Sequence, residues 1–257
     1  MARQARQRSE SGIYHIVVRG INHQDIFYDD DDFKRFLETI ADKKSEQEFL
    51  VYGYCLMNNH VHLLIRENSD NISRIMNRLG TTYAWWYNRK YDRSGYVFQG
   101  RYGSECVEND AYLLTVMRYI HNNPVKANIS SQAEDYRWSS IHAYYGGKEY
   151  PTGLTETGLI LGIFHQDKNH AILGLRKYMK ADNDDRCIDC EARLRKSDSE
   201  VKAEIEHIMN GQPIWNLYNM DKAYRKEILK QIKELEGTTQ RQIARVTGLS
   251  PNIIFKA

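Results

Sequence analysis

Two apolar runs separated by two asparagines are the feature that most restricts how this chain can fold. Residues 49–57 and 60–66 are rich in β-branched, aromatic and aliphatic side chains, and only Asn58 and Asn59 lie between them. Asparagine tolerates the backbone angles of a tight turn, so the pattern predicts a β-hairpin. A hairpin joins antiparallel strands, and we therefore expect an antiparallel sheet.

Further strands and helices are expected on both sides of this hairpin, from the spacing of apolar residues. In order, they are a strand at 13–19, a helix at 32–47, the hairpin, a helix at 72–91, a fourth strand within 95–107 and a helix at 108–122. Asn71 or Asp70 is the expected cap of the second helix, and Pro124 is expected just past the end of the third. This order favours an α+β fold with helices on one or both faces of the sheet.

Beyond residue 147 the pattern becomes helical, which predicts three regions. These are a domain at 1–147, a helical connector at 148–196 and a small all-α region at 197–257. Within the last region, residues 238–257 are a candidate helix-turn-helix, with Gly248 in the turn and Pro251 at the first helical position. This segment resembles the C-terminal DNA-binding domain of the bacterial replication initiator, although its second helix is short.

Composition excludes several classes of protein. The 257 residues contain no apolar run long enough for a membrane span and no secretory signal after Met1, so we expect a cytoplasmic protein. The four cysteines are too few and too scattered for a disulfide framework, and Cys187 and Cys190 lack the second pair that a zinc site needs.

The net charge of +2 does not by itself identify a nucleic-acid binder, but cations cluster locally. Aromatic residues stand among them at 83–91, where they could stack on unpaired bases or pack in the core; we expect most of them in the core. The candidate DNA contacts are Arg3, Arg19, Arg78, Arg89, Lys90, Arg101, Arg241 and Asn252.

The sequence His60-Val61-His62 is a candidate metal site. Side chains alternate between the two faces of a strand, so both imidazoles point to one face and Val61 points to the other. Two neutral imidazoles side by side can hold a divalent cation. A pair of this kind is also common without any metal.

Tyr119 and Asn123 are four residues apart on the third helix and therefore share a face. A cation held by His60, His62 and the Asn123 amide oxygen could bind a phosphodiester, which Tyr119 would then attack. Tyr112 lies two turns earlier on nearly the same face, so spacing alone does not decide which phenol is the nucleophile.

Several motifs together resemble the REP-associated tyrosine transposases of the single-tyrosine HUH superfamily. The motifs are Tyr14-His15, Arg19-Gly20, residues 57–64 (MNNHVHLL), residues 97–102 (VFQGRY), residues 119–127 (YIHNNPVKA) and residues 138–140 (WSS). The resemblance covers about residues 1–145.

This resemblance implies a ferredoxin- or RRM-like antiparallel sheet of four or five strands. It implies Tyr119 as the nucleophile, and His60, His62 and Asn123 as ligands of Mg²⁺ or Mn²⁺. It further implies cleavage and transfer of single-stranded DNA beside a hairpin, through a 5′-phosphotyrosine. Insertion-sequence relatives often have glutamine where Asn123 stands. The expected partner is single-stranded or hairpin DNA, the expected oligomeric state is a monomer or homodimer, and no membrane association is expected.

Two other functions remain open at this point. A metal-dependent hydrolase would use the two histidines to activate water, with Glu67 as the nearby candidate base. A DNA-binding regulator without catalytic activity would rely on residues 238–257. Replacing the Tyr119 hydroxyl separates both of these from the transposase.

Overall fold

The computed structural model describes residues 7–44, 49–188, 198–235, 238 and 240–256. The chain forms two compact units, Met1–Cys190 and Glu191–Ala257. The boundary lies near the end of the region expected as a connector. Residues 148–188 instead belong to the first unit, because α5 (Gly158–Phe164) and α6 (Lys168–Lys180) place Ile160, Leu161 and Leu175 in its core.

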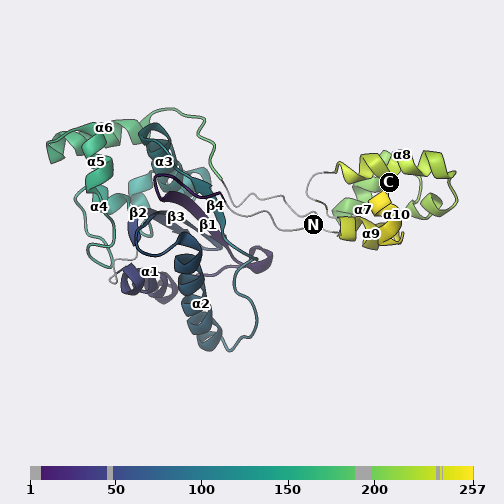
Figure 1. Ribbon diagram of the computed structural model, residues 1–257, viewed down its shortest axis with the longest axis horizontal. Coiled ribbons are helices and arrows are strands. Elements are labelled where there is room, and N and C mark those ends of the chain that lie inside the picture. Colours follow the sequence, from purple (N-terminus) through teal and green to yellow (C-terminus); the bar gives the residue numbers. More distant parts are fainter. Residues whose placement is uncertain (1–6, 45–48, 189–197, 236–237, 239, 257) are drawn as a thin grey trace. The chain divides into compact units, whose positions relative to one another are not determined.

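The first unit is built on a four-stranded antiparallel sheet with the order β2-β3-β1-β4 (Figure 1). The strands are β1 (Ile13–Arg19), β2 (Phe49–Met57), β3 (His60–Glu67) and β4 (Gly103–Cys106). β2 and β3 form the expected hairpin, with Met57 opposite His60. The predicted α+β fold with an antiparallel sheet and flanking helices is confirmed.

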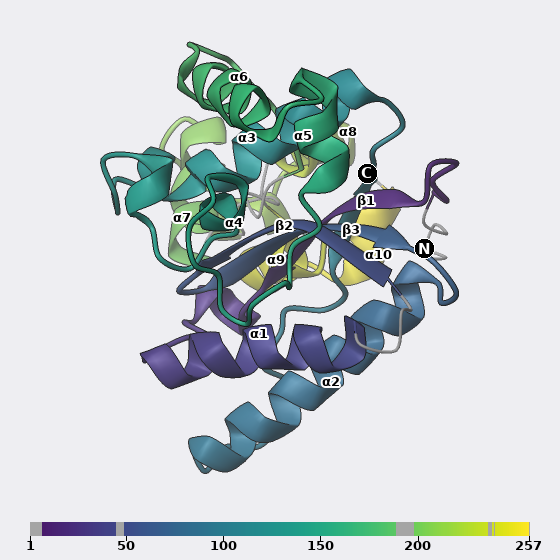
Figure 2. The same cartoon turned by 90° about the vertical axis from the view of Figure 1, so that its left-hand side faces the viewer.

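Helices cover both faces of this sheet. Figure 2 shows α1 (Asp30–Lys44) and α2 (Ile72–Lys90) on one face and α3 (Asp110–Lys126) on the other. The buried side chains of α1 follow the expected helical spacing, and they are Phe33, Phe36, Leu37 and Ile40. Asn71 caps α2 by accepting a hydrogen bond from the Arg74 backbone N–H at 3.0 Å, so the first of the two expected caps is confirmed.

Aromatic residues on α2 serve mainly the core, as expected. Tyr83 and Tyr87 are fully buried, and the Tyr83 hydroxyl donates to the Ile26 carbonyl at 2.6 Å. Trp85 is the exception, because 63% of its side chain is exposed. Lys90 serves the fold as well, because it forms ion pairs with Asp29 and Asp32 at 2.6 and 2.7 Å.

Two helix boundaries differ from those expected. Pro124 lies inside α3 and does not follow it, since the helix continues to Lys126. Proline removes only one backbone donor, and the next turn still closes through the hydrogen bond from the Ala127 N–H to the Asn123 carbonyl at 2.9 Å. The helical part of the region expected at 148–196 is divided into α5 and α6 by a break at His165–Asp167, where Asp167 caps α6.

The second unit is all-helical and has a core of its own. It contains α7 (Asp198–Ile208), the 3-10 segment Ile214–Tyr218, α8 (Lys222–Lys233), α9 (Gln240–Thr247) and α10 (Pro251–Lys256). Buried members of this core include Val201, Leu217, Ile232, Ile243 and Ile254. Nowhere in the described ranges is there a helix with the length and apolar character needed to span a bilayer.

Candidate active site

The β-hairpin places His60 and His62 on the sheet face that α3 covers. Val61 between them is fully buried and points to the opposite face. His62 is fully buried, whereas His60 is partly exposed. The turn that precedes His60 is held by main-chain bonds, because the Asn58 carbonyl accepts from the Ile26 N–H at 2.7 Å.

His62 is held in the state that binds metals. Burial, followed by the nearby His15 and His60, lowers its pKa well below the usual value, so the imidazole is neutral. A hydrogen bond of 3.1 Å joins its Nδ1 to Nε2 of His15. Its Nε2 is buried and has no hydrogen-bond partner in the described part of the chain. Burying such a nitrogen is costly unless it binds something, and a divalent cation fits it.

Sequence reasoning assigned no role to Glu105, which continues this chain of contacts. His15 lies opposite Glu105 in the pairing of β1 with β4, and its Nδ1 is 3.8 Å from the Glu105 carboxylate. The nearby His15 imidazole lowers the pKa of Glu105 to about 2. Glu105, His15 and His62 therefore form a line that orients the His62 ring. Glu105 could have been found only through the strand register, which the sequence does not show.

Helix α3 brings Tyr119 against the same histidines. Its ring contacts His62 and His15 edge-on, with centroids 5.8 and 6.0 Å apart, and only 5% of the side chain is exposed. The Lys126 ammonium lies 4.5 Å from the centroid of the same ring. Asn109 starts the helix by accepting from the Tyr112 N–H at 2.8 Å. The Tyr119 phenol, the Lys126 ammonium and two imidazoles thus lie close together on this face of the sheet.

Asn123 lies one turn after Tyr119 and is nearly buried. Its amide nitrogen donates to the Tyr119 carbonyl at 3.0 Å, which fixes the amide plane. Because the nitrogen is used in this bond, the amide oxygen is the Asn123 atom suited to a metal.

Tyr112, the other candidate nucleophile, belongs to a different set of contacts. Burial and the hydrogen bond to Glu105 raise its pKa, and Cys187 is another neighbour of this phenol. A carboxylate beside a phenol disfavours the phenolate that a nucleophile needs. The environment therefore favours Tyr119. Burial raises the pKa of the Cys187 thiol to about 11, and Cys190 lies outside the described residues.

The candidate DNA contacts fall into separate groups. Arg19 lies opposite His60 in the strand register, and Arg101 lines a cavity beside α2. Arg78 is 3.6 Å from Asp70. Arg89 lies over the Trp85 ring at 5.5 Å, Lys90 is held in the ion pairs described above, and Asn252 is exposed on α10. Arg3 and the side chain of Arg241 lie outside the described residues.

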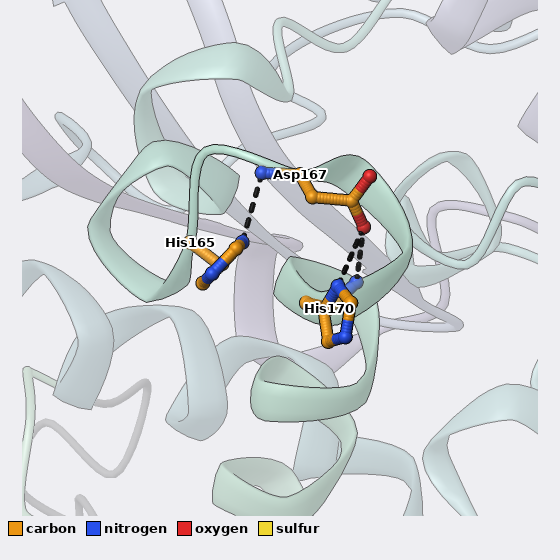
Figure 3. Close-up of side chains that lie close together, drawn as sticks. All are labelled: His165, Asp167 and His170. Atoms are coloured by element: carbon orange, nitrogen blue, oxygen red, sulfur yellow. Dashed lines mark hydrogen bonds and ion pairs between the residues drawn. The ribbon is translucent and has the colours of Figure 1, made fainter.

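A second group of possible metal ligands lies at the start of α6. His165, Asp167 and His170 offer ligand atoms within 4.8 Å of one another, and all three are exposed (Figure 3). Helix capping accounts for this closeness, since Asp167 accepts from both the backbone N–H and the ring of His170. These residues lie on the surface, and none of them belongs to the strand or the helix that carries His60, His62 and Tyr119.

Residues 9–123 match the family described as transposase IS200-like. This part of the chain is therefore similar to the IS200-like transposases. The match includes His60, His62, Tyr119 and Asn123. It also includes His15 and Glu105, the two residues that orient the His62 ring.

The fold of residues 9–123 was also compared with solved structures, and the match with a TM-score of 0.50 agrees with it. One match is a structure described as a REP-associated tyrosine transposase bound to a REP hairpin, with a TM-score of 0.50 and 16% identity, covering 74% of this chain and all of that one. Another is a protein from Deinococcus radiodurans R1 described as a candidate transposase, with a TM-score of 0.34 and 15% identity, covering 47% of this chain and 96% of that one. No curated protein matches the chain.

Proposed function

We propose that this protein cleaves and rejoins single-stranded DNA through a covalent bond to Tyr119. The observation that carries this proposal is the edge-on contact of Tyr119 with His62, whose buried neutral imidazole keeps Nε2 available. A phenol beside a metal-ready nitrogen suits attack on a phosphodiester.

The residues that would hold the divalent cation, Mg²⁺ or Mn²⁺, are His60, His62 and Asn123. When bound, the cation would neutralise the charge of the scissile phosphate. His15 and Glu105 hold the His62 ring in place, as metal-binding histidines generally require. Lys126 keeps a positive charge beside the phenol and so favours its ionised form.

The proposed reaction replaces one phosphoester bond with another. The Tyr119 oxygen forms a bond to phosphorus while the bond from phosphorus to the 3′ oxygen breaks. The 3′ oxygen leaves as a hydroxyl with the proton of the phenol, and the 5′ phosphate remains on Tyr119. Because the ester bond is conserved, the reverse step can join this phosphate to another 3′ hydroxyl without ATP.

Hairpin-bearing single-stranded DNA is the proposed substrate. A structurally similar protein is described as bound to a REP hairpin, and the motifs of this chain resemble that family. A strand that is unpaired beside a hairpin can place its backbone at the sheet face, whereas a continuous duplex is bulkier there.

The decisive experiment incubates the full chain with end-labelled hairpin DNA and Mn²⁺ and analyses it on a denaturing gel. We expect a covalent adduct that disappears in EDTA and in Tyr119→Phe, while DNA affinity stays nearly unchanged. Tyr112→Phe is the matched control and should retain the adduct. An adduct that persists in Tyr119→Phe, or nucleotide mapped to Tyr112, would overturn the proposal.

The structure disfavours the alternative in which these histidines activate water for a hydrolase. Glu67 is the candidate base, but it lies five residues along β3 from His62, a distance of about 16 Å. Because side chains alternate between the two faces of a strand, Glu67 also points to the face opposite His62. Glu67 instead accepts hydrogen bonds from the Tyr14 hydroxyl and the Ile72 N–H, and so fixes the start of α2.

The proposed role of the second unit is additional affinity for duplex DNA. Helices α9 and α10 are joined at Gly248, whose φ of +73° suits the turn of a helix-turn-helix. If the protein acted only as a DNA-binding regulator through this unit, the arrangement of residues around Tyr119 would have no function.

A further inference from the structure

A cavity of about 660 Å³ lies between α2 and the segment 95–102. It extends to Val18 and Arg19 at the end of β1 and to Phe36 of α1. Its volume is in the range of ligand-binding clefts in proteins. Neither Tyr119 nor either of the candidate metal-binding histidines lines it, so it is a site of its own.

Exposed aromatic side chains line this cavity. Trp85 on α2 and Tyr96 on the facing segment are 63% and 86% exposed, and Phe98 adds a third ring. The neighbouring aromatics Tyr83 and Tyr87 on the same helix are fully buried, so Trp85 is not required for the core. Large rings left in solvent beside a cleft are suited to stacking against flat ligands such as nucleobases.

The charge of the cavity also suits nucleic acid. Arg19 and Arg101 belong to its lining, and none of the described lining residues is acidic. The Arg89 guanidinium lies over the Trp85 ring at 5.5 Å, which adds positive charge at the rim. Cations interleaved with aromatic rings bind the phosphates and bases of an unpaired strand together.

The cavity is connected to the candidate active site through main-chain bonds. Arg19 is the register partner of His60, and partners in an antiparallel pair lie about 5 Å apart. The Gln99 N–H donates to the Arg19 carbonyl at 2.8 Å, and Phe98 forms a bridge with Gly20. The segment 95–102, which carries Tyr96 and Phe98, is therefore attached to the end of β1 that adjoins His60.

We propose that this cavity binds unpaired nucleobases of the DNA strand that flanks the scissile phosphate. Trp85 and Tyr96 stack on the bases, and Arg19 and Arg101 contact the adjoining phosphates. This inference rests on the proposed function, because it takes single-stranded DNA as the substrate. It adds the place where the unpaired bases are held and the residues that hold them.

The test measures DNA affinity with full-length Tyr119→Phe protein in EDTA, so that no cleavage interferes. The probe is a fluorescent hairpin oligonucleotide with single-stranded flanks, in which one abasic site is moved through successive flank positions. We expect an abasic site at one or two positions to weaken binding roughly 5- to 150-fold, the effect of losing one stacked base. The same abasic sites should have little further effect once Trp85→Ala and Tyr96→Ala are introduced.

Two control variants make this result specific. Trp215→Ala removes a tryptophan of the same 63% exposure from the second unit, and the protein should keep its full sensitivity to the abasic sites. Trp85→Phe keeps a ring in the cavity and should also keep most of this sensitivity. Because Trp85 and Tyr96 are exposed, their replacement should leave the circular dichroism spectrum unchanged.

The inference fails if the abasic sites weaken binding equally with and without the two aromatic residues. It also fails if Trp85→Ala with Tyr96→Ala binds the intact probe as tightly as the parent protein. This result is independent of the covalent adduct. If the sensitivity to abasic sites depends on Trp85 and Tyr96 but no adduct forms, the base site is supported and the Tyr119 chemistry is rejected. If an adduct forms but this sensitivity does not depend on the two aromatic residues, the chemistry is supported and this base site is rejected.

Discussion

At the scale of single residues, the candidate site depends on how the environment of each side chain sets its charge. His62 is neutral because burial lowers its pKa, and His15 holds its ring in one orientation. Tyr112 and Tyr119 are the same amino acid on the same helix, yet a carboxylate faces one and an ammonium faces the other. The neighbours of each phenol, more than its position in the sequence, distinguish the two.

The first residue-scale prediction concerns Lys126, whose ammonium lies 4.5 Å from the Tyr119 ring. Lys126→Met should slow adduct formation in single-turnover assays by roughly tenfold, because the charge stabilises the phenolate. The deficit should shrink toward pH 10, about where a free phenol ionises unaided. Lys126→Arg should keep most of the rate, and Lys168→Met, at an exposed position at the start of α6, should have no effect. A deficit that stays constant over the whole pH range would argue for a structural role.

The second concerns Glu105, whose pKa is lowered from 4.5 to about 2, mainly by the nearby His15 imidazole. A lowered pKa means that the ionised carboxylate stabilises the folded state above about pH 4.5, and that this contribution is lost as the pH falls toward 2. Glu105→Gln should therefore lower the urea midpoint at about pH 7 and should have a smaller effect at more acidic pH. Midpoints measured across this range test the prediction, and a deficit that grows on acidification would contradict it.

At the scale of elements, one buried ion pair fixes the chain after α6 against α3. The Arg118 guanidinium binds both carboxylate oxygens of Asp185, at 2.6 and 2.9 Å, and also donates to the Tyr178 carbonyl. Both side chains are about nine-tenths buried. Arg118 precedes Tyr119, so this pair also helps to set the rotation of the helix that carries the candidate nucleophile.

Asp185→Ala should destabilise the first unit by about 3 kcal/mol, because it leaves the Arg118 charge buried without its partner. The matched control is Asp30→Ala, which breaks the Arg137–Asp30 pair at the same 2.6 Å distance. The side chains of that pair are 65% and 55% exposed, so its loss should cost less than about 1 kcal/mol. Calorimetry of the full chain measures the stability of both variants. Equal losses of stability would show that burial does not determine the cost of breaking an ion pair.

At the scale of the whole molecule, the two units have separate hydrophobic cores. All the residues proposed for cleavage lie in the first unit, Met1–Cys190. The second unit contributes α9 and α10, the candidate duplex-binding helices. Under the proposed function, the first unit performs the chemistry and the second unit adds affinity for duplex DNA.

A chain ending after Cys190 should therefore fold and should still form the adduct on a short oligonucleotide at saturating protein. Its affinity for DNA with a duplex arm should fall, and the dependence of that affinity on salt should become shallower, because fewer phosphates are neutralised. Affinity titrations at several salt concentrations, together with the gel assay, measure the two effects. Loss of the adduct in a truncated protein that remains folded would show that the second unit helps to build the site.

Local patterns in the sequence were enough to predict most of the elements and much of the candidate site. The Asn58-Asn59 turn between two apolar runs predicted the hairpin, and strand alternation placed His60 and His62 on one face, because both patterns are local. Helical spacing likewise placed Tyr119 and Asn123 on one face of α3. Local rules failed at Pro124, since a proline in the last turn removes one hydrogen bond without ending the helix.

Which of these faces meet depends on the way the strands pair and the helices pack. The pairing of β1 with β3 and β4 brings His15 and Glu105 into line with His62, and these contacts are far apart in the sequence. The packing of α3 on the sheet sets Tyr119 against the histidines and Tyr112 against Glu105, a choice that spacing left open. Long-range register and packing depend on how the whole core closes, and therefore no local pattern encodes them.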